Sequence, residues 1–230
     1  MIAWSIGCCA KEFPPARLFP EAKLTQFILI RHGETEWNRV ERFRGRANLA
    51  LNEAGRGQAE ATAFSLSDSD VAAMYTSPLR RALETADIIS NHLGVFAQLL
   101  KGLIDIDYGS WQGISPADAA KQDPEHYTKW IERPQEVRFP GGESLREVRS
   151  RVMAAVEQLA VGHRDETVIL VSHKVVCQVL LCALIGLDNS HFWQIGQDVS
   201  AINNFEFKDT ATTVTLVNNT CHLKDLTAGK

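Results

Sequence analysis

Short apolar runs alternate with longer amphipathic stretches along most of this chain. The short runs have the length of buried strands, and the longer stretches have the spacing of helices. Strands that alternate with helices indicate parallel pairing, because a parallel neighbour requires a long crossover connection. The pattern predicts strands at residues 26–30, 71–75, 94–100 and 167–171, and helices at 52–66, 79–86, 143–159 and 175–185.

The end of the chain departs from this alternation. Residues 202–207 and 213–217 favour strands and are joined by Lys208-Asp209-Thr210, which predicts a terminal antiparallel hairpin. The fold class that follows is α/β, a three-layer α/β/α sandwich around a mostly parallel sheet. We expect Phe205 and Phe207 to lie at an exposed edge of the hairpin. Such an edge suggests a homodimer paired across a two-fold axis.

Two segments fall outside the sandwich. Residues 1–24 contain Pro14, Pro15 and Pro20, which break helices, so an irregular N-terminal arm is expected before a domain at 25–230. Residues 105–145 contain several aromatic residues, prolines and glycines. This stretch is longer than a simple connection and predicts a small cap of irregular backbone.

Composition narrows the possible functions. The 230 residues suffice for one α/β domain with a sizeable core. The net charge of −4 provides no basic field for nucleic acid, and no apolar run reaches membrane-spanning length. The five cysteines match neither a zinc motif nor a redox pair, which favours reduced thiols and a cytoplasmic location.

Polar side chains follow three of the predicted strands at the point where each strand ends. They are Arg31-His32-Gly33, Ser77 with Arg80-Arg81, and Ser172-His173. Parallel strands end at one edge of the sheet, where α/β proteins place ligands, and the following helices direct their N-termini there. Arginines and histidines at one edge suit a phosphoryl group, whose charge and geometry must be held.

These motifs resemble the histidine phosphatase superfamily, also called phosphoglycerate-mutase-like. The resemblance covers residues 25–222 and rests on three motifs in order. Within the superfamily the chain is most similar to the metal-independent phosphoserine phosphatases. The motifs are Arg31-His32-Gly33-Glu34-Thr35 with Trp37-Asn38, Ser77-Pro78-Leu79-Arg80-Arg81-Ala82, and Ser172-His173; the closer likeness rests on residues 104–111, 140–145, 191–193 and 219–223.

The resemblance implies a role for each matching residue. His32 is the expected nucleophile, which becomes phosphohistidine. Arg31, Arg81 and His173 are expected to cradle the phosphoryl oxygens, with Asn38 as a further donor and Ser172 beside them. Flanking cations disfavour protonation of His32 and so favour the neutral imidazole that can attack phosphorus. No metal and no cofactor is expected.

This sequence departs from the family pattern at three positions. Asp105 stands where relatives usually carry the glutamate that protonates the leaving oxygen, and Asp107 is the alternative acid. Arg44 replaces a frequent glutamine and is a candidate to bind a substrate carboxylate. Lys174 replaces a small residue and either points away from the pocket or adds a charge beside it.

His222 is the last candidate. The likeness to phosphoserine phosphatases suggests that it meets the amino-acid portion of the substrate, while a plain surface histidine is the alternative.

The predicted reaction is hydrolysis of a small phosphate ester through phosphohistidine, with a carboxylate-bearing metabolite as substrate and phosphoserine first. The alternatives are a cofactor-dependent phosphoglycerate mutase, a phosphatase of broad specificity or for a sugar phosphate or α-ribazole phosphate, and a non-catalytic regulatory module. All four residues of the nucleophile and cradle, Arg31, His32, Arg81 and His173, are present, which disfavours the regulatory module.

Overall fold

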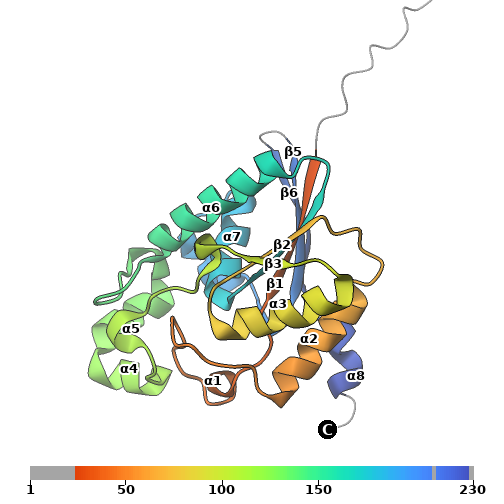
Figure 1. The fold of residues 1–230 in the computed structure, drawn as a ribbon. Helices are drawn as coiled ribbons and strands as arrows, with labels where there is room; N and C mark the ends of the chain where they lie inside the picture. Colours follow the sequence, from red (N-terminus) through yellow and green to blue (C-terminus); the bar gives the residue numbers. More distant parts are fainter. Residues whose placement is uncertain (1–23, 209–210, 228–230) are drawn as a thin grey trace, which may run out of the picture.

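Six strands form one sheet in the order β3-β2-β4-β1-β5-β6 (Figure 1). The structure is a computed structural model that describes residues 24–208 and 211–227. β1, β2, β3 and β4 are parallel to one another, and β5 pairs with both β1 and β6 in antiparallel fashion. The strands are β1 (Leu24–Arg31), β2 (Ala73–Thr76), β3 (Ala97–Leu99), β4 (Thr167–Ser172), β5 (Ile202–Lys208) and β6 (Ala211–Asn219).

Helices cover both faces of the sheet, so the predicted three-layer α/β/α fold is confirmed (Figure 1). Side chains of β1 alternate between the two cores, as the two-residue period of a strand requires. Phe27 and Leu29 pack in the core beneath α6 and α7, while Ile28 and Ile30 pack beneath α2 and α3. The helices are α1 (Glu36–Arg39), α2 (Glu53–Ser65), α3 (Arg80–Leu93), α4 (Pro116–Gln122), α5 (Pro124–Glu132), α6 (Leu145–Gly162), α7 (Lys174–Leu184) and α8 (Lys224–Thr227).

Helix ends follow the local sequence closely. Asn52 caps α2, because its side chain accepts a hydrogen bond from the Gly55 N–H. Ser144 and Glu147 form a capping box at the start of α6, so this helix begins at Leu145 and extends to Gly162. Gly94 ends α3 with φ of 72°, a conformation that favours glycine.

The segment 105–145 is more regular than predicted. It contains α4 and α5, which both begin with a proline directly after a capping residue, Ser115 or Asp123. Proline is tolerated in the first turn of a helix, where its missing N–H leaves no hydrogen bond unmade. Pro116 and Pro124, which indicated irregular backbone, therefore start helices. That this segment acts as a cap stays a prediction.

The structure corrects the expectation that Phe205 and Phe207 lie at an exposed edge of the sheet. β5 lies between β1 and β6, so the edge strand of the sheet is β6. Phe205 is fully buried and its ring stacks on Phe27 with centroids 4.9 Å apart. A homodimer stays a prediction, and any pairing of sheet edges on this side would use β6.

The described residues bear only partly on two further predictions, the N-terminal arm and the absence of a membrane span. Of the predicted arm at residues 1–24, only Leu24 lies within the described residues, and it opens β1. Among the helices described, none is long and apolar enough to cross a membrane.

Candidate active site

The three polar strand ends meet at one edge of the sheet, as predicted. Arg31 is in register with Ser172 across the parallel β1–β4 pair. The next residue, His32, donates its backbone N–H to the Ser172 carbonyl at 2.9 Å. Ser77, after β2, donates its N–H to the carbonyl of Val171 in β4. The backbone of the sheet therefore fixes the relative positions of His32 and His173.

His32 is buried and held as a specific tautomer. Its Nδ1 lies 2.7 Å from the Gly33 carbonyl, which can only accept, so the ring proton is assigned to Nδ1. Nε2 accepts a hydrogen bond from Arg81 Nε at 3.2 Å. Burial, and then the charges of Arg81 and Arg31, hold the pKa of His32 well below its ordinary value. The neutral ring therefore presents an Nε2 lone pair at neutral pH.

His173 faces His32, with ring centroids 5.1 Å apart. Its Nε2 lies 2.6 Å from Ser77 Oγ, which accepts from the Leu79 N–H and can donate its own proton to Nε2. This arrangement assigns the His173 ring proton to Nδ1. Burial, and then Arg81, lower the pKa of His173 well below its ordinary value.

Two buried nitrogens at this edge have no hydrogen-bond partner within residues 24–208 and 211–227. They are His173 Nδ1 and Arg31 Nε. The Arg31 side chain is otherwise fixed, since Nη1 donates to the Gln197 carbonyl. Burial, followed by the charge of Arg44, lowers the pKa of Arg31 to about 10. Buried donors without partners are rare, so this pair indicates that an acceptor binds here.

Arg81 links His32 to Asp105. Its guanidinium is fully buried, and Nη2 lies 2.8 Å from Asp105 Oδ2. Two carbonyls of the 45–47 turn accept one hydrogen bond each from Nη1 and Nη2. Asp105 Oδ2 is also 3.8 Å from His173 Nδ1, and Arg151 holds the Asp105 carbonyl. Both predicted site residues, Arg81 and Asp105, therefore stand beside the histidine pair.

Asp107, the alternative acid, is placed elsewhere. Its carboxylate forms an ion pair with Arg46 at 3.2 Å and accepts the Gly109 N–H. It does not line the cavity that Asp105 lines. Asp105, although shorter than the glutamate of relatives, is therefore the carboxylate that lies at the site, and Asp107 is not.

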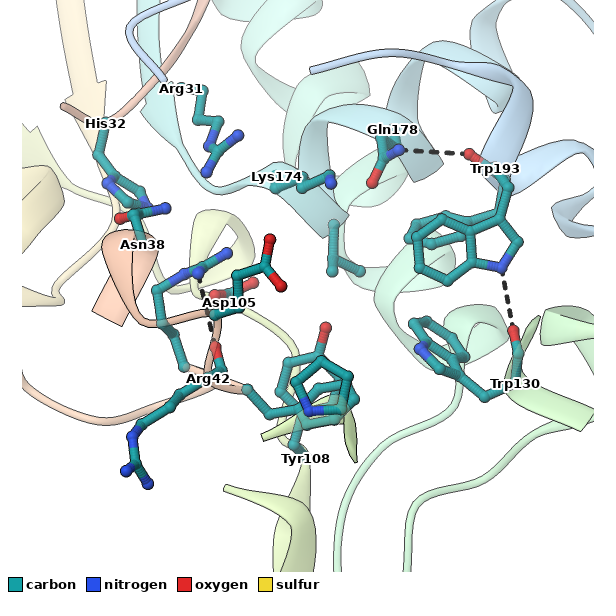
Figure 2. Close-up of a pocket in the computed structure, with 16 residues that line it drawn as sticks. Arg31, His32, Asn38, Arg42, Asp105, Tyr108, Trp130, Lys174, Gln178 and Trp193 are labelled. Atoms are coloured by element: carbon teal, nitrogen blue, oxygen red, sulfur yellow. Dashed lines mark hydrogen bonds between the residues drawn. The ribbon is translucent and has the colours of Figure 1, made fainter. Parts of the chain in front are cut away.

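A cavity of about 350 Å³ opens beside His32 and Asp105 (Figure 2). Arg31, Arg42, Arg44 and Lys174 line it with positive charge, and Asn38 lies next to His32. Burial, and then the charge of Arg31, lower the pKa of Lys174. Of the two orientations considered for Lys174, the structure has the one that adds a charge to the pocket. An aromatic wall completes the cavity, formed by Tyr108, Trp130, Phe192 and Trp193.

Four predicted site residues do not line this cavity. Arg81 and His173 contact lining residues directly, whereas Ser172 and His222 are engaged elsewhere. Ser172 Oγ is buried and donates to the Leu103 carbonyl at 2.8 Å, so it fixes the backbone instead. His222 packs against α2, where its Nε2 lies 3.1 Å from Thr62 Oγ1. Neither lines the cavity, and the side chain of His222 reaches a different face of the molecule.

Sequence reasoning missed Gln178 and underestimated the aromatic wall. Gln178 lines the cavity from α7, one helical turn after Lys174. Its signal in the sequence is weak but present, because it is the one polar residue between Val175 and Leu184. Trp130 packs against Phe139 within residues 105–145 and also lines the cavity.

The chain belongs to the histidine phosphatase superfamily, branch 1, whose pattern matches residues 27–220. It is 36% identical to phosphoserine phosphatase 1 of Hydrogenobacter thermophilus over 87% of this chain and 95% of that protein. Its fold is similar to that of YhfR of Bacillus stearothermophilus, with a TM-score of 0.83 and 29% identity over 87% of this chain and all of that one. A mycobacterial glucosyl-3-phosphoglycerate phosphatase is similar with a TM-score of 0.79 and 25% identity, covering 86% of this chain and 100% of that one.

Proposed function

We propose that this protein is a metal-independent phosphatase that hydrolyses a small phosphomonoester through a phosphohistidine at His32, with phosphoserine as the first candidate substrate. One observation carries the proposal. Arg31 Nε and His173 Nδ1 are buried and have no hydrogen-bond partner in the described chain, and both side chains stand close to His32, whose Nε2 is unprotonated. A phosphoryl group supplies acceptors for both donors and an electrophile for the nitrogen.

The first half of the reaction transfers the phosphoryl group to the enzyme. The His32 Nε2 lone pair attacks phosphorus, and the P–O bond to the alcohol breaks. The departing oxygen takes a proton from the Asp105 carboxyl as this bond breaks, so the alcohol leaves neutral. The Nδ1–H of His32 stays hydrogen-bonded to the Gly33 carbonyl, which stabilises the charge that develops on the ring.

The second half returns the enzyme to its starting state. Asp105, now a carboxylate, takes a proton from water as the water oxygen attacks phosphorus. The P–N bond breaks, its electrons return to His32 Nε2, and phosphate leaves. Arg31, Arg81 and His173 hold the phosphoryl oxygens through both halves, with Asn38 as a further donor. The site thereby supplies its own positive charge, which supports a reaction without a metal ion.

Positive charge beyond the phosphate end supports a substrate with a carboxylate. Arg44 and Lys174 line the cavity and add to the charge of Arg31. The relative from Hydrogenobacter is named for phosphoserine, which has this carboxylate. A second candidate is a larger sugar-bearing ester, because the cavity has an aromatic wall and a structural neighbour is named for glucosyl-3-phosphoglycerate. Action as a mutase and a cytoplasmic location stay predictions.

Phosphate release from a panel of esters in EDTA tests this function. The panel contains phosphoserine, phosphothreonine, 3-phosphoglycerate, glucosyl-3-phosphoglycerate and p-nitrophenyl phosphate, each assayed with the H32A variant in parallel. We expect a preference for phosphoserine that disappears in the variant. Conversion of 3-phosphoglycerate to its isomer without phosphate release would instead identify a mutase. No phosphate release from any ester of the panel would contradict the proposal.

Removing the Lys174 charge is expected to weaken binding of the substrate carboxylate. The K174M variant keeps the length and packing of the side chain, and should raise the KM for phosphoserine about tenfold. The KM for phosphoethanolamine, which lacks the carboxylate, should change much less. The matched control is K121M, because Lys121 is exposed on α4 and away from the cavity. Equal effects of K174M on both esters would contradict this role.

Stability should fall on mild acidification because His32 and His173 are buried as neutral rings. Both have a pKa lowered in the fold, so the unfolded chain binds more protons below its ordinary histidine pKa near 6.5. The free energy of unfolding should therefore decrease between pH 6.5 and 5, by up to about 1.4 kcal/mol per pH unit for each histidine. Urea denaturation across this range measures it. The H32Q variant should have a shallower slope; an unchanged slope would contradict the assignment.

A further inference from the structure

Gln178 presents an unused acceptor to the cavity. It belongs to α7, is 2% exposed and lines the cavity that contains His32 and Asp105. Its Nε2 donates to the Ile195 carbonyl at 2.6 Å and to the Phe192 carbonyl at 3.4 Å. Two carbonyls can only accept, so they fix which end of the amide faces them. Oε1 has no hydrogen-bond partner in the part of the chain that the structure describes.

An acceptor of this kind is costly unless a ligand uses it. Leaving a buried polar atom without a partner costs about 1–3 kcal/mol, which is why such atoms are few in folded proteins. The amide cannot rotate to relieve the cost without losing both bonds from Nε2. Since the side chain lines the substrate cavity, the missing donor is expected to come from the substrate.

The position of Gln178 on α7 places it with the charged end of the cavity. Residues four apart lie on the same face of a helix, so Gln178 follows Lys174 by one turn. His173, which caps the start of the same helix, stands at the phosphate end. After His173, the helix therefore presents a cation, Lys174, and a neutral acceptor, Gln178, to the cavity in succession (Figure 2).

We propose that Gln178 Oε1 determines specificity by accepting a hydrogen bond from a donor on the leaving group of the substrate. The inference rests on the proposed phosphatase function and names the substrate class more closely. The preferred esters are phosphates of alcohols that carry an ammonium or hydroxyl donor next to a carboxylate. Lys174 and Arg44 attract the carboxylate, and Gln178 selects for the donor, so α-amino and α-hydroxy acid phosphates fit both ends.

A matched pair of esters isolates this interaction. Phosphoserine and 3-phosphonooxypropanoate differ only in the amino group, because the second compound keeps the carboxylate and the phosphate. The wild-type enzyme should have a kcat/KM for phosphoserine about 10- to 100-fold higher than for the donor-free ester, since a site built around a polar group rejects a substrate that lacks its partner.

The Q178M variant tests whether Gln178 causes this preference. Methionine keeps the length of the side chain but is a poor acceptor. The ratio of kcat/KM for the two esters should fall about tenfold or more in Q178M, and differences in intrinsic reactivity cancel when the ratios of the two enzymes are compared. The Q158L variant is the control, because Gln158 is exposed on α6, and its ratio should match that of the wild type.

The outcomes separate this inference from the proposed function. A wild-type enzyme that hydrolyses both esters equally well overturns the inference, whether or not the variant folds. A Q178M enzyme that loses activity on both esters by the same factor assigns Gln178 a structural role through its Nε2 bonds and also overturns it. A wild-type enzyme that releases phosphate from no ester overturns the phosphatase function itself.

Discussion

Replacement of His32 by alanine is expected to reduce phosphate release from phosphoserine by more than about 10⁴-fold. The variant loses the nucleophile, and the remaining cradle can bind the ester without forming a covalent intermediate. The loss should appear in kcat for every ester of the panel, because attack on phosphorus is common to all of them. Steady-state phosphate release, with protein concentrations high enough to measure a residual rate, provides the comparison.

The control for this variant is H92A. His92 is exposed at the end of α3, where its Nε2 contacts Ser67 Oγ, and it lies outside the cavity. This variant should keep wild-type kinetics. A H32A enzyme that retains more than a few per cent of wild-type kcat would contradict the role of His32, provided that circular dichroism shows both variants to be folded.

Replacement of Asp105 by asparagine should produce the second largest effect, and the effect should depend on the leaving group. Asparagine keeps the shape of the side chain but cannot give a proton to the leaving oxygen. For phosphoserine, whose alkoxide leaves poorly, kcat should fall by about 10² to 10⁴-fold. For p-nitrophenyl phosphate the rate of the first turnover, measured as a burst of nitrophenolate, should fall far less, because nitrophenolate leaves without a proton. The later hydrolysis of phosphohistidine, in which Asp105 acts as the base, should slow equally for both esters.

Two further variants serve as controls for this prediction. D107N is the control, since Asp107 pairs with Arg46 outside the cavity, and it should leave the difference between the two esters as in the wild type. D105E keeps an acid at the same position and should retain the response of the wild type to the leaving group. Equal losses in the first-turnover rate of D105N for both esters would contradict the role of Asp105 as the acid and would point to its ion pair with Arg81 instead.

The sequence predicted correctly those site residues whose positions follow from the register of the parallel strands alone. Arg31, His32 and His173 follow strands of a parallel sheet, so the pairing of β1 with β4 brings them together whatever the rest of the chain does. Arg81 follows from the same rule through β2 and the first turn of α3. Asp105 was predicted from the family pattern, and its ion pair with Arg81 places it beside the two histidines.

Side-chain direction and tertiary packing account for the differences. Ser172 and His173 are neighbours on one strand end, yet only the histidine turns to the site, while the serine hydroxyl meets the Leu103 carbonyl. The strand pattern at Phe205 could not distinguish an interior strand from an edge strand, because both bury one face. Gln178 went unnoticed within an apolar helix, since its significance arises only from the carbonyls at Phe192 and Ile195.

The most direct test of the account is to trap the covalent intermediate. The enzyme would be mixed with phosphoserine labelled in its phosphate, in EDTA, quenched with alkali within milliseconds, and mapped by mass spectrometry. The account predicts a single phosphorylated residue, His32, modified at Nε2, with a linkage that acid hydrolyses and alkali preserves. Phosphate release at full rate without labelled protein, or with the label on a different residue, would contradict it.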